Sequence, residues 1–440
     1  MRGYSVLSQE FQDPMYLKSI TLKNFRNYDH LQFEPKRGLN VLLGKNAQGK
    51  TNLLEALNIL ASSKSFRVRR EEDLIMWGCD HAEIKADFIN THNEERSLII
   101  RWALNPITHN WDRRILINNQ IIKRLGDFLG EIPLVLFVPG DLALIQGAPE
   151  LRRRLLDVLL CKIYQKYYTC LVNFQKVLRQ YNKFLHDAIK NGTIENCIEG
   201  SDRGYLEIWN KQLIKYGSQI IYCRLIVMVY LEPVVSQVYA QLSEAKQDVL
   251  KLKYVSNLNN FGLKSIGKSI KSALLEQSTE VNGQLGSNLN IDELIQENVL
   301  GEIEKVYAEA LCRNLHSKNL GHSFITTGPH RDDFGIDSFG YNLKIFGSQG
   351  QHRSTALALR LAEAKFMSLA AGEESIILLD DCFSELDRSR SKLLLSYLSG
   401  LGQVFLTAAN TLEFSEPFTY SPDFGFFKVS AGQIEPVSHT

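Results

Sequence analysis

Apolar and polar residues alternate with a period of two along much of the first part of the chain, as in strands with one buried face. The alternation over 15–25 is followed by a short polar turn and then resumes at 31–34. This pattern predicts an antiparallel pair of strands. The same pattern over 82–89 and 97–104 predicts a hairpin, and 114–117 predicts a further strand. The chain is therefore expected to begin with antiparallel sheet.

Four short runs are almost entirely apolar, which is typical of strands buried on both faces of a parallel sheet. They lie at 40–43, 134–138, 375–379 and 404–407. The first run is followed at 51–60 by leucines and alanines with the spacing of an amphipathic helix. Buried strands connected to helices in this way predict an α/β fold.

Two long helical patterns occupy the middle of the chain. In the first, over 163–185, apolar residues recur in steps of four and three, and Arg152, Arg153 and Arg154 precede it. The second begins near Leu206 and is expected to stop at Pro233. At about 1.5 Å per residue, each helix would be roughly 40 Å long, enough to form an antiparallel arm.

The region after the second pattern gives weaker signals. Residues 256–300 are rich in Asn, Ser, Gly and Gln, which predicts loops and an insertion with little core. Residues 303–315 return to a helical pattern, and 323–327 are expected to form a strand.

Length and charge limit the possible functions. A chain of 440 residues exceeds what one hydrophobic core usually covers, which favours two lobes. The formal net charge of +1 gives no overall attraction to nucleic acid, so a local patch would have to bind such a partner. The seven cysteines are scattered without a Cys-x-x-Cys pair, which indicates reduced thiols in a cytoplasmic protein.

Membrane and export signals are weak. The chain has no run of roughly 18 consecutive apolar residues, and its most apolar segment, 220–229, contains Arg224. Residues 1–14 lack the pattern of a signal peptide and are expected to be an extension without function, because the alternating pattern starts at Met15. We therefore expect no membrane partner.

A phosphate-binding loop follows the first apolar run. The pattern Gly-x-x-x-x-Gly-Lys-Ser/Thr is matched without a mismatch, between a predicted strand and a predicted helix. The glycines permit a tight backbone wrap, Lys50 can reach the outer phosphates and Thr51 would bind magnesium. The loop consists of Gly44, Lys45, Asn46, Ala47, Gln48, Gly49, Lys50 and Thr51.

Two carboxylates follow the apolar run at 375–379. At the carboxyl edge of a parallel sheet, Asp380 would hold magnesium and Asp381 could orient the attacking water. Together with the phosphate loop, this pair predicts a nucleotide triphosphatase in which Asp380, Asp381 and Lys50 carry the reaction.

Two basic features leave alternatives open. Arg26, just after the first strand, could contact a nucleotide phosphate or lie exposed at the strand end. A loop at 62–70 could bind a DNA phosphate backbone, or could be a solvated loop partly neutralised by the acidic residues 71–73. The candidate DNA-binding side chains are Lys64, Arg67, Arg69 and Arg70.

A second anion site is suggested at 347–353. Ser348 starts a predicted helix that runs toward Gly372, so it is either a plain cap or part of a site where exposed amides meet an anion. A further serine opens the segment 384–387, which ends in Asp387. His330 lies within the run 328–333, and a structural hydrogen bond is favoured over a catalytic role for it. For Arg331, a contact with DNA and a contact with a protein partner stay open as alternatives.

Together these motifs resemble the head of ABC-type ATPases, with mixed sheet, helices and an inserted helical arm lobe. The runs at 23–27, 64–67, 328–333 and 348–359 are in addition similar to the RecF family of bacterial recombination-repair proteins, over about residues 15–430. The resemblance implies a head at 15–140 and 321–440 that carries an arm lobe at 141–320.

The resemblance also implies a homodimer that closes around two ATP molecules with Mg²⁺. The signature of one copy would contact the triphosphate bound by Lys50 and Thr51 of the other, with Asp387 at the junction. The implied activity is a weak DNA-dependent ATPase in recombinational repair, replication and the SOS response to DNA damage. The implied partners are double-stranded DNA, junctions of single and double strands, RecR and RecO. The signature residues are Ser348, Gln349, Gly350 and Gln351.

The chain departs from ABC transporter heads at several positions. Asp381 stands where those heads usually have Glu, which predicts slow turnover, and Thr407 lies where many have a histidine. Gln146 is the only guess for the magnesium-sensing glutamine. The alternatives are a transporter ATPase subunit, an SMC-type tether and a P-loop kinase. The long inserted arm and Asp381 argue against a transporter subunit, and the same arm is far too short for an SMC-type tether. The signature argues against the kinase.

Overall fold

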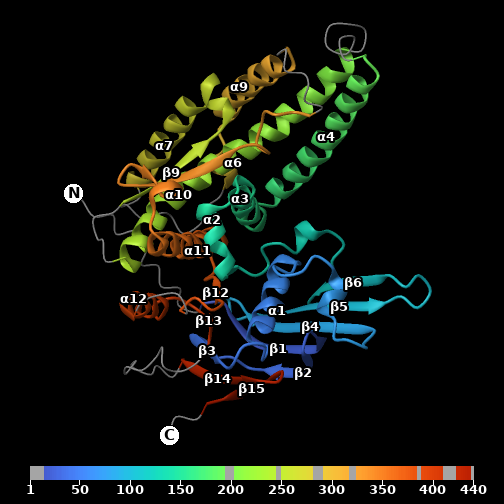
Figure 1. Ribbon diagram of the computed structural model, residues 1–440, viewed down its shortest axis with the longest axis vertical. Coiled ribbons are helices and arrows are strands. Elements are labelled where there is room, and N and C mark those ends of the chain that lie inside the picture. Colours follow the sequence, from blue (N-terminus) through green and yellow to red (C-terminus); the bar gives the residue numbers. More distant parts are fainter. Residues whose placement is uncertain are drawn as a thin grey trace. The chain divides into compact units, whose positions relative to one another are not determined.

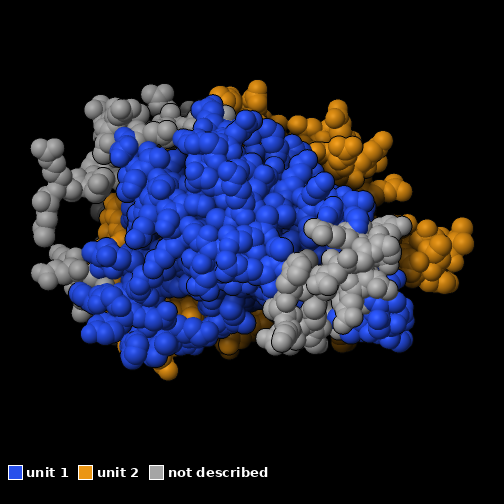
Figure 2. Space-filling model, turned by 90° about the horizontal axis from the view of Figure 1, so that it is seen from above, with its two compact units in different colours: residues 1–7, 146–234, 249–347 blue, residues 8–145, 235–248, 348–440 orange. Residues whose placement is uncertain are grey.

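The structure is a computed structural model that describes residues 14–193, 203–243, 249–280, 291–316, 324–383, 388–409 and 423–437. The described residues fall into two compact units, coloured separately in Figure 2. Unit 1 comprises those of 146–234 and 249–347, and unit 2 those of 8–145, 235–248 and 348–440. The proposed extension at 1–14 lies outside the described residues except for Pro14.

Unit 2 contains an antiparallel sheet with the strand order β2-β1-β4-β5-β6-β7 (Figure 1). Buried positions alternate along β4, and Ala82, Ile84, Ala86 and Phe88 face the core. The strands predicted from the two-residue period are thus confirmed. They are β1 (Tyr16–Phe25), β2 (Tyr28–Phe33), β4 (His81–Ile89), β5 (Glu95–Leu104) and β6 (Trp111–Ile117). The short β7 (Gln120–Ile121) was not predicted.

The second sheet of unit 2 has the order β15-β14-β3-β13-β12-β8. Its five strands from β14 to β8 run parallel, because each pairs in parallel with its neighbour, so their carboxyl ends share one edge. The four apolar runs are confirmed as four adjacent strands of this sheet, of which β8 lies at the edge, whereas the last two strands of the chain were not predicted. The strands are β3 (Leu39–Leu43), β8 (Leu134–Phe137), β12 (Ile376–Leu379), β13 (Val404–Ala408), β14 (Gly425–Ser430) and the antiparallel β15 (Gln433–Pro436).

Helix α1 (Lys50–Ser62) packs between the two sheets of unit 2, with Leu53, Leu54 and Leu57 buried among residues of both. Helix α11 (Gln349–Ala371) packs on β8 and ends at Gly372, which has the left-handed conformation of a helix C-cap (φ 67°). The remaining helical elements of the unit are η1 (Glu71–Leu74), η2 (Leu125–Asp127), η3 (Pro139–Leu142) and α12 (Arg388–Leu398).

Unit 1 is mostly helical and has a small sheet of order β11-β10-β9. The long helices α4 and α6 lie side by side and antiparallel, because Tyr181 donates to Asn210 whereas Cys170, earlier in α4, donates to Tyr216, later in α6 (Figure 1). The elements are α3 (Pro149–Ile163), α4 (Gln165–Lys190), α6 (Arg203–Leu242), β9 (Leu250–Val255), η4 (Asn257–Phe261), α7 (Leu263–Glu280), α8 (Ile291–Leu294), α9 (Glu297–His316), β10 (Asp333–Ser338), β11 (Tyr341–Asn342) and α10 (Leu343–Phe346). Helix α2 (Ala143–Gln146) spans the border between the units, and the last turns of α6 belong to unit 2.

Pro233 does not stop the second long helix, contrary to the prediction, because α6 continues to Leu242. The residues after it, such as Val234 and Val235, are fully buried, so packing outweighs the hydrogen bond that a proline removes. The arginines at 152–154 precede the first long helix, α4, as predicted, but they lie within a separate helix, α3, in which Pro149 occupies a first-turn position.

Two further predictions in unit 1 were wrong. Part of the region expected to form loops, 263–280, is helix α7, whose buried residues Leu263, Ile266, Ile270 and Leu274 recur at helical spacing. The many small polar residues of this segment hide that period. Residues 324–327 form no strand, and the nearby strand is β10, whose six residues pair with those of β9.

One helix among the described residues, Leu206–Leu242, is long and apolar enough to cross a membrane by composition alone. In its most apolar window, however, 72% of the residues are buried inside the protein. Arg224 in this helix is buried and forms an ion pair with Asp157 of α3 at 2.7 Å. These features are those of a core helix, for which such a composition is weak evidence of a membrane span.

Candidate nucleotide-binding site

The phosphate loop lies between β3 and α1, at the carboxyl edge of the parallel sheet. Two of its glycines are required by close contacts. A side chain at Gly44 would place its Cβ 2.4 Å from the backbone oxygen of Val429, on β14. Gly49 has φ 121°, and a Cβ there would lie 2.8 Å from the Tyr28 hydroxyl. Only glycine fits both positions.

Polar contacts hold the loop to two neighbouring turns. The Tyr28 hydroxyl donates to the Gly49 carbonyl at 3.0 Å, and the Asn27 amide donates to the Gln48 carbonyl at 3.0 Å. On the other side, the backbone N–H of Ala431 donates to the Gln48 side chain at 2.9 Å. The wrapped conformation is therefore built into the fold, which is what a preformed phosphate site needs.

Lys50, the first residue of α1, donates its ammonium to the carbonyl oxygens of Gly44 and, at 3.0 Å, of Lys45. Its side chain therefore folds over the phosphate loop itself. Burial lowers the pKa of Lys50, while the nearby carboxylates Asp380 and Asp381 act in the opposite direction. The ammonium is thus bound to the loop, and the two carboxylates favour its charged form.

The structure brings Thr51 and Asp380 together, although they are far apart in the chain. The Thr51 hydroxyl donates to Oδ1 of Asp380 at 3.0 Å. Thr407, at the end of β13, donates to the same oxygen at 2.8 Å. Burial raises the pKa of Asp380, and these two hydroxyls oppose that shift. A carboxylate beside a hydroxyl is an oxygen donor set that suits Mg²⁺.

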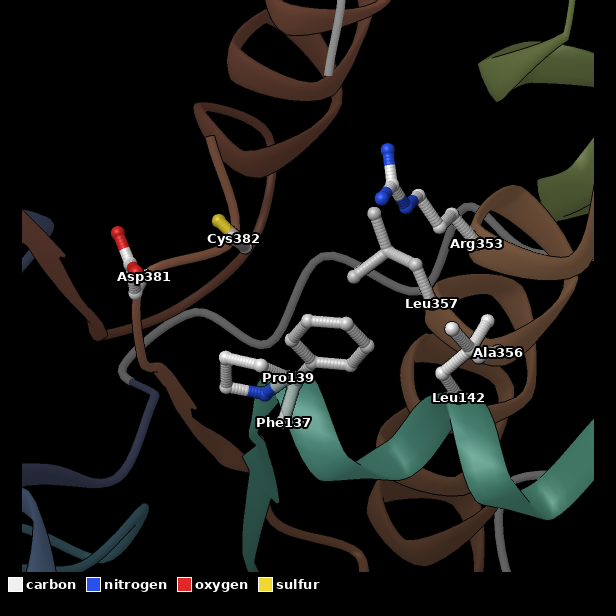
Figure 3. A pocket seen from close by; sticks show the side chains of 8 residues that line it. All are labelled: Phe137, Pro139, Leu142, Arg353, Ala356, Leu357, Asp381 and Cys382. Carbon is white, nitrogen blue, oxygen red and sulfur yellow. The ribbon is translucent and has the colours of Figure 1, made fainter. Parts of the chain in front are cut away.

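Asp381 is exposed and follows Asp380 in a left-handed backbone conformation (φ 47°). It lies at one end of a pocket whose opposite side is formed by α11, with Arg353 across from it (Figure 3). The pocket has an apolar floor from the end of β8 and η3. Its lining residues are Phe137, Pro139, Leu142, Arg353, Ala356, Leu357, Asp381 and Cys382.

Ser348 is exposed and caps α11. Its side chain accepts from the Gln351 N–H at 3.2 Å, and the Gln351 side chain accepts from the Ser348 N–H at 2.9 Å. A Cβ at Gly350 would lie 2.4 Å from the Arg390 guanidinium of α12. This end of a long helix is therefore preformed and faces solvent. Asp387 lies outside the described residues.

Arg26 is neither exposed nor directed at the phosphate loop. Its guanidinium forms two hydrogen bonds with Glu55 of α1, at 2.7 and 2.8 Å, and one with the Asp73 carbonyl at 2.6 Å. The side chain of Glu55 is fully buried, and that of Arg26 is 16% exposed. Arg26 therefore ties the first strand to α1.

The basic loop divides into two kinds of residue. Arg67 donates to Asn52 at 2.6 Å and lies 3.6 Å from Glu55, so its charge is partly neutralised. Lys64, Arg69 and Arg70 are exposed, and Arg70 has only a long contact of 3.4 Å with Glu72.

Two of the three arginines of α3, Arg152 and Arg153, make structural contacts, whereas Arg154 is exposed. Arg152 is buried and pairs with both carboxylate oxygens of Asp333, at 2.7 and 2.8 Å, and Arg153 donates to the Asp332 carbonyl at 2.6 Å. The run 328–333 is thereby anchored within unit 1. His330, which belongs to this run, shares a hydrogen bond with the Ile325 carbonyl at 2.9 Å, and burial lowers its pKa to about 4. These contacts fit the structural role expected for it.

Sequence patterns missed three residues that shape the site. Glu55 and Asn27 bind side chains or backbone beside the phosphate loop. Glu55 belongs to no recognisable motif, and Asn27 lies in the run 23–27 but had no role assigned to it. Thr407 was noted only for its place near the end of the last predicted strand. Its position after an apolar run, like that of Asp380, was the available signal, because parallel strands end at the same edge of the sheet.

Unit 2 combines a phosphate loop and a carboxylate pair on one mixed sheet with the preformed start of α11. These features define an ATPase head of the kind found in SMC proteins. The family model described as "RecF/RecN/SMC N terminal domain" matches residues 16–419. The solved Smc head domain of Pyrococcus furiosus has a TM-score of 0.50 at 16% identity, with 97% of this chain and 96% of that chain covered, which shows the fold alone.

Within this class, the chain belongs to the RecF family. It is 32% identical to the DNA replication and repair protein RecF of Oenococcus oeni, over 96% of this chain and 99% of that protein. It is also 32% identical to the RecF of Enterococcus faecalis, over 97% of this chain and all of that protein. A solved structure of the recombination mediator protein RecF-ATPrS in the RecFOR pathway has a TM-score of 0.77 and 28% identity, and covers 97% of this chain and 99% of that chain.

Family membership favours an ATPase of DNA replication and repair over a transporter subunit or a structural tether. The predicted fold class, an ATPase head of mixed sheet and helices, is confirmed. A solved structure of the recombination mediator protein RecF-ATP in the RecFOR pathway also matches, with a TM-score of 0.74 at 27% identity over 96% of this chain and 99% of that chain.

Proposed function

We propose that this chain is an ATP-dependent DNA-binding protein of recombinational repair and replication whose ATP site is completed by a second copy. The observation that carries the proposal is the contact of Thr51 with Asp380 at 3.0 Å, combined with the exposed Ser348 at the start of α11. The first pair supplies half of an ATP site within one chain. The second supplies a helix start that can bind the triphosphate held by another chain.

In this proposal, the phosphate loop from Gly44 to Thr51 binds the triphosphate and Lys50 neutralises its outer phosphates. Thr51 and Asp380 would hold Mg²⁺, which would offset negative charge on the phosphates when bound. Asp381 orients the attacking water. Because its side chain is one methylene shorter than the Glu of many related heads, hydrolysis is weak, and DNA stimulates it.

ATP binding drives homodimerisation, because the contacts of the Ser348–Gln351 signature with ATP exist only in the closed dimer. A ligand that binds one state better shifts the population toward that state. Asp387 is proposed to lie at the same junction. Hydrolysis removes the bridging phosphate and returns the protein to the monomer. The protein thus acts as a switch that resets slowly.

The proposed ligand of the dimer is double-stranded DNA or a junction of single and double strands. The exposed cations Lys64, Arg69 and Arg70 supply a local phosphate-binding surface on a chain that is nearly neutral overall, and Arg67 contributes less. The matched RecF structure is described as a recombination mediator of the RecFOR pathway. We extend this role, with RecR and RecO as partners in recombinase loading, to this chain in the cytoplasm.

We also propose the division of the chain into a head at 15–140 and 321–440 and an arm lobe at 141–320. The borders between the compact units, at Gln146 and Ser348, differ from the proposed domain borders at 141 and 321. Antiparallel packing of α4 and α6 supports the arm.

The test is DNA binding over a range of salt concentrations, with and without ATP. We expect ATP-dependent binding whose affinity falls steeply with salt and depends little on sequence. Arg69→Ala/Arg70→Ala should reduce the salt slope by about two, one per lost phosphate contact. The charge-matched control Lys123→Ala/Arg124→Ala, at two other exposed positions of unit 2, should leave the slope unchanged. If ATP does not increase DNA binding even at low salt, the proposed function is wrong.

A further inference from the structure

The strand order places Thr407 between the phosphate loop and the carboxylate pair of the same chain. Its strand, β13, lies between β3, which leads into the phosphate loop, and β12, which leads into Asp380 and Asp381. All three strands run parallel. The carboxyl end of β13 therefore lies between the loop and the two carboxylates.

The Thr407 hydroxyl makes two hydrogen bonds of opposite direction. It donates its proton to Oδ1 of Asp380 at 2.8 Å and accepts the backbone N–H of Asp381, also at 2.8 Å. The residue is 1% exposed, so these bonds are shielded from water. A hydroxyl can do both at once, whereas the methyl group of valine, with the same shape, can do neither.

The bond to Asp381 acts on an unusual backbone. With φ 47°, Asp381 lies in the left-handed region, which few residues other than glycine adopt. A hydrogen bond to its amide stabilises this conformation and thereby sets the direction in which the exposed carboxylate leaves the strand. The bond to Asp380 fixes the oxygen that Thr51 also contacts.

We infer that Thr407 is the positioning residue of this ATPase: it orients Asp380 toward the Mg²⁺ position and Asp381 toward the attacking water. The inference rests on the roles proposed above for these two carboxylates. Thr407 itself need not touch ATP.

The test compares Thr407→Val, Thr407→Ser and a matched control. The control is Thr355→Val, which removes a fully buried hydroxyl of the same unit that has no hydrogen-bond partner among the described residues. For each variant, ATP affinity is measured in EDTA and in Mg²⁺ by calorimetry, and kcat and KM are measured for hydrolysis. Binding in EDTA also shows that the variant is folded, and Thr407→Ala replaces the valine variant if that one does not fold.

For Thr407→Val we expect ATP binding in EDTA close to wild type, a smaller gain in affinity from Mg²⁺, and a kcat about 10- to 100-fold lower, since a misplaced reacting group has such an effect. KM should change little. Thr407→Ser keeps the hydroxyl and should restore both kcat and the effect of Mg²⁺, and Thr355→Val should match wild type.

Wild-type kcat and Mg²⁺ dependence in Thr407→Val would overturn the inference. So would an equal loss in the valine and serine variants, because it would show that the packing of the methyl group matters instead of the hydroxyl. Asp381→Asn separates this result from the proposed function. If Asp381→Asn is inactive while Thr407→Val is normal, only the role of Thr407 is wrong. If Asp381→Asn hydrolyses ATP normally, the role proposed for Asp381 is wrong.

Discussion

Replacing Arg26 by alanine should destabilise unit 2 without directly removing an ATP contact. The Arg26 guanidinium makes a two-point ion pair with Glu55, whose side chain is fully buried. Removing one partner of a buried pair costs about 3–5 kcal/mol, because the other charge is left without compensation. Here Ser65 also donates to Glu55, and Arg67 lies 3.6 Å away, so part of the compensation remains.

We therefore expect the free energy of unfolding to fall by about 2–3 kcal/mol in Arg26→Ala. For a unit of this size, that loss corresponds to a decrease of about 4–12 °C in the unfolding temperature. Arg67→Ala is the matched control. Its side chain is 44% exposed, so the loss of its longer contact with Glu55 should cost only about 0.5 kcal/mol.

The assay is calorimetric unfolding, with a double-mutant cycle that combines Arg26→Ala and Glu55→Gln. The two changes should be clearly less than additive, because each removes the same interaction. ATP affinity is measured on the same samples below the transition. An Arg26→Ala protein with wild-type unfolding temperature but weakened ATP binding would refute this reasoning, since Arg26 would then be a nucleotide ligand.

Three other outcomes follow from the contacts described above. Lys50→Arg should retain part of the ATP binding measured by calorimetry but lose turnover, because arginine keeps the charge but not the compact ammonium that fits the loop. Full turnover in this variant would contradict the role of Lys50. Burial lowers the pKa of His330 to about 4 from an ordinary value near 6.5, so the neutral ring contributes stability above pH 6.5 that is lost as the pH falls toward 4. His330→Gln should therefore unfold with a shallower dependence on pH in this window than wild type, and equal slopes would show that the ring is not buried as described. Arg152→Ala should destabilise unit 1 by about 3 kcal/mol, because it leaves Asp333 without its ion-pair partner, and DNA affinity should stay unchanged. The control is Arg154→Ala, at an exposed neighbouring position. A selective loss of DNA binding in Arg152→Ala would contradict the structural assignment.

The strands of unit 2 could be predicted because their burial follows the sequence period closely. Strands β4 and β5 have one buried face, and β3 and β12 are buried on both faces, so each leaves a distinct pattern. Helix α7 and the passage of α6 through Pro233 could not be predicted in this way. Helix α7 packs on α9, and α6 continues because the residues after Pro233, such as Val234 and Val235, are buried. This packing outweighs local preferences such as that of proline.

The phosphate loop and the carboxylate pair could be predicted because each motif is contiguous and is followed or preceded by a recognisable element. The role of Arg26 could not, since a single arginine after a strand gives no sign of a buried partner 29 residues further along the chain. The same holds for Arg152, which looked like part of a basic cluster. Its partner, Asp333, is 181 residues away in sequence, and only the fold brings them together.

The central claim is that Ser348 of one copy completes the ATP site of another. Sedimentation velocity of wild type and Ser348→Arg, with and without ATP, tests it most directly. Ser265→Arg, the same change at an exposed serine of α7, is the control. We expect ATP to convert wild type and the control into dimers, whereas Ser348→Arg binds ATP and stays monomeric. A Ser348→Arg protein that dimerises with ATP as wild type does would contradict the claim.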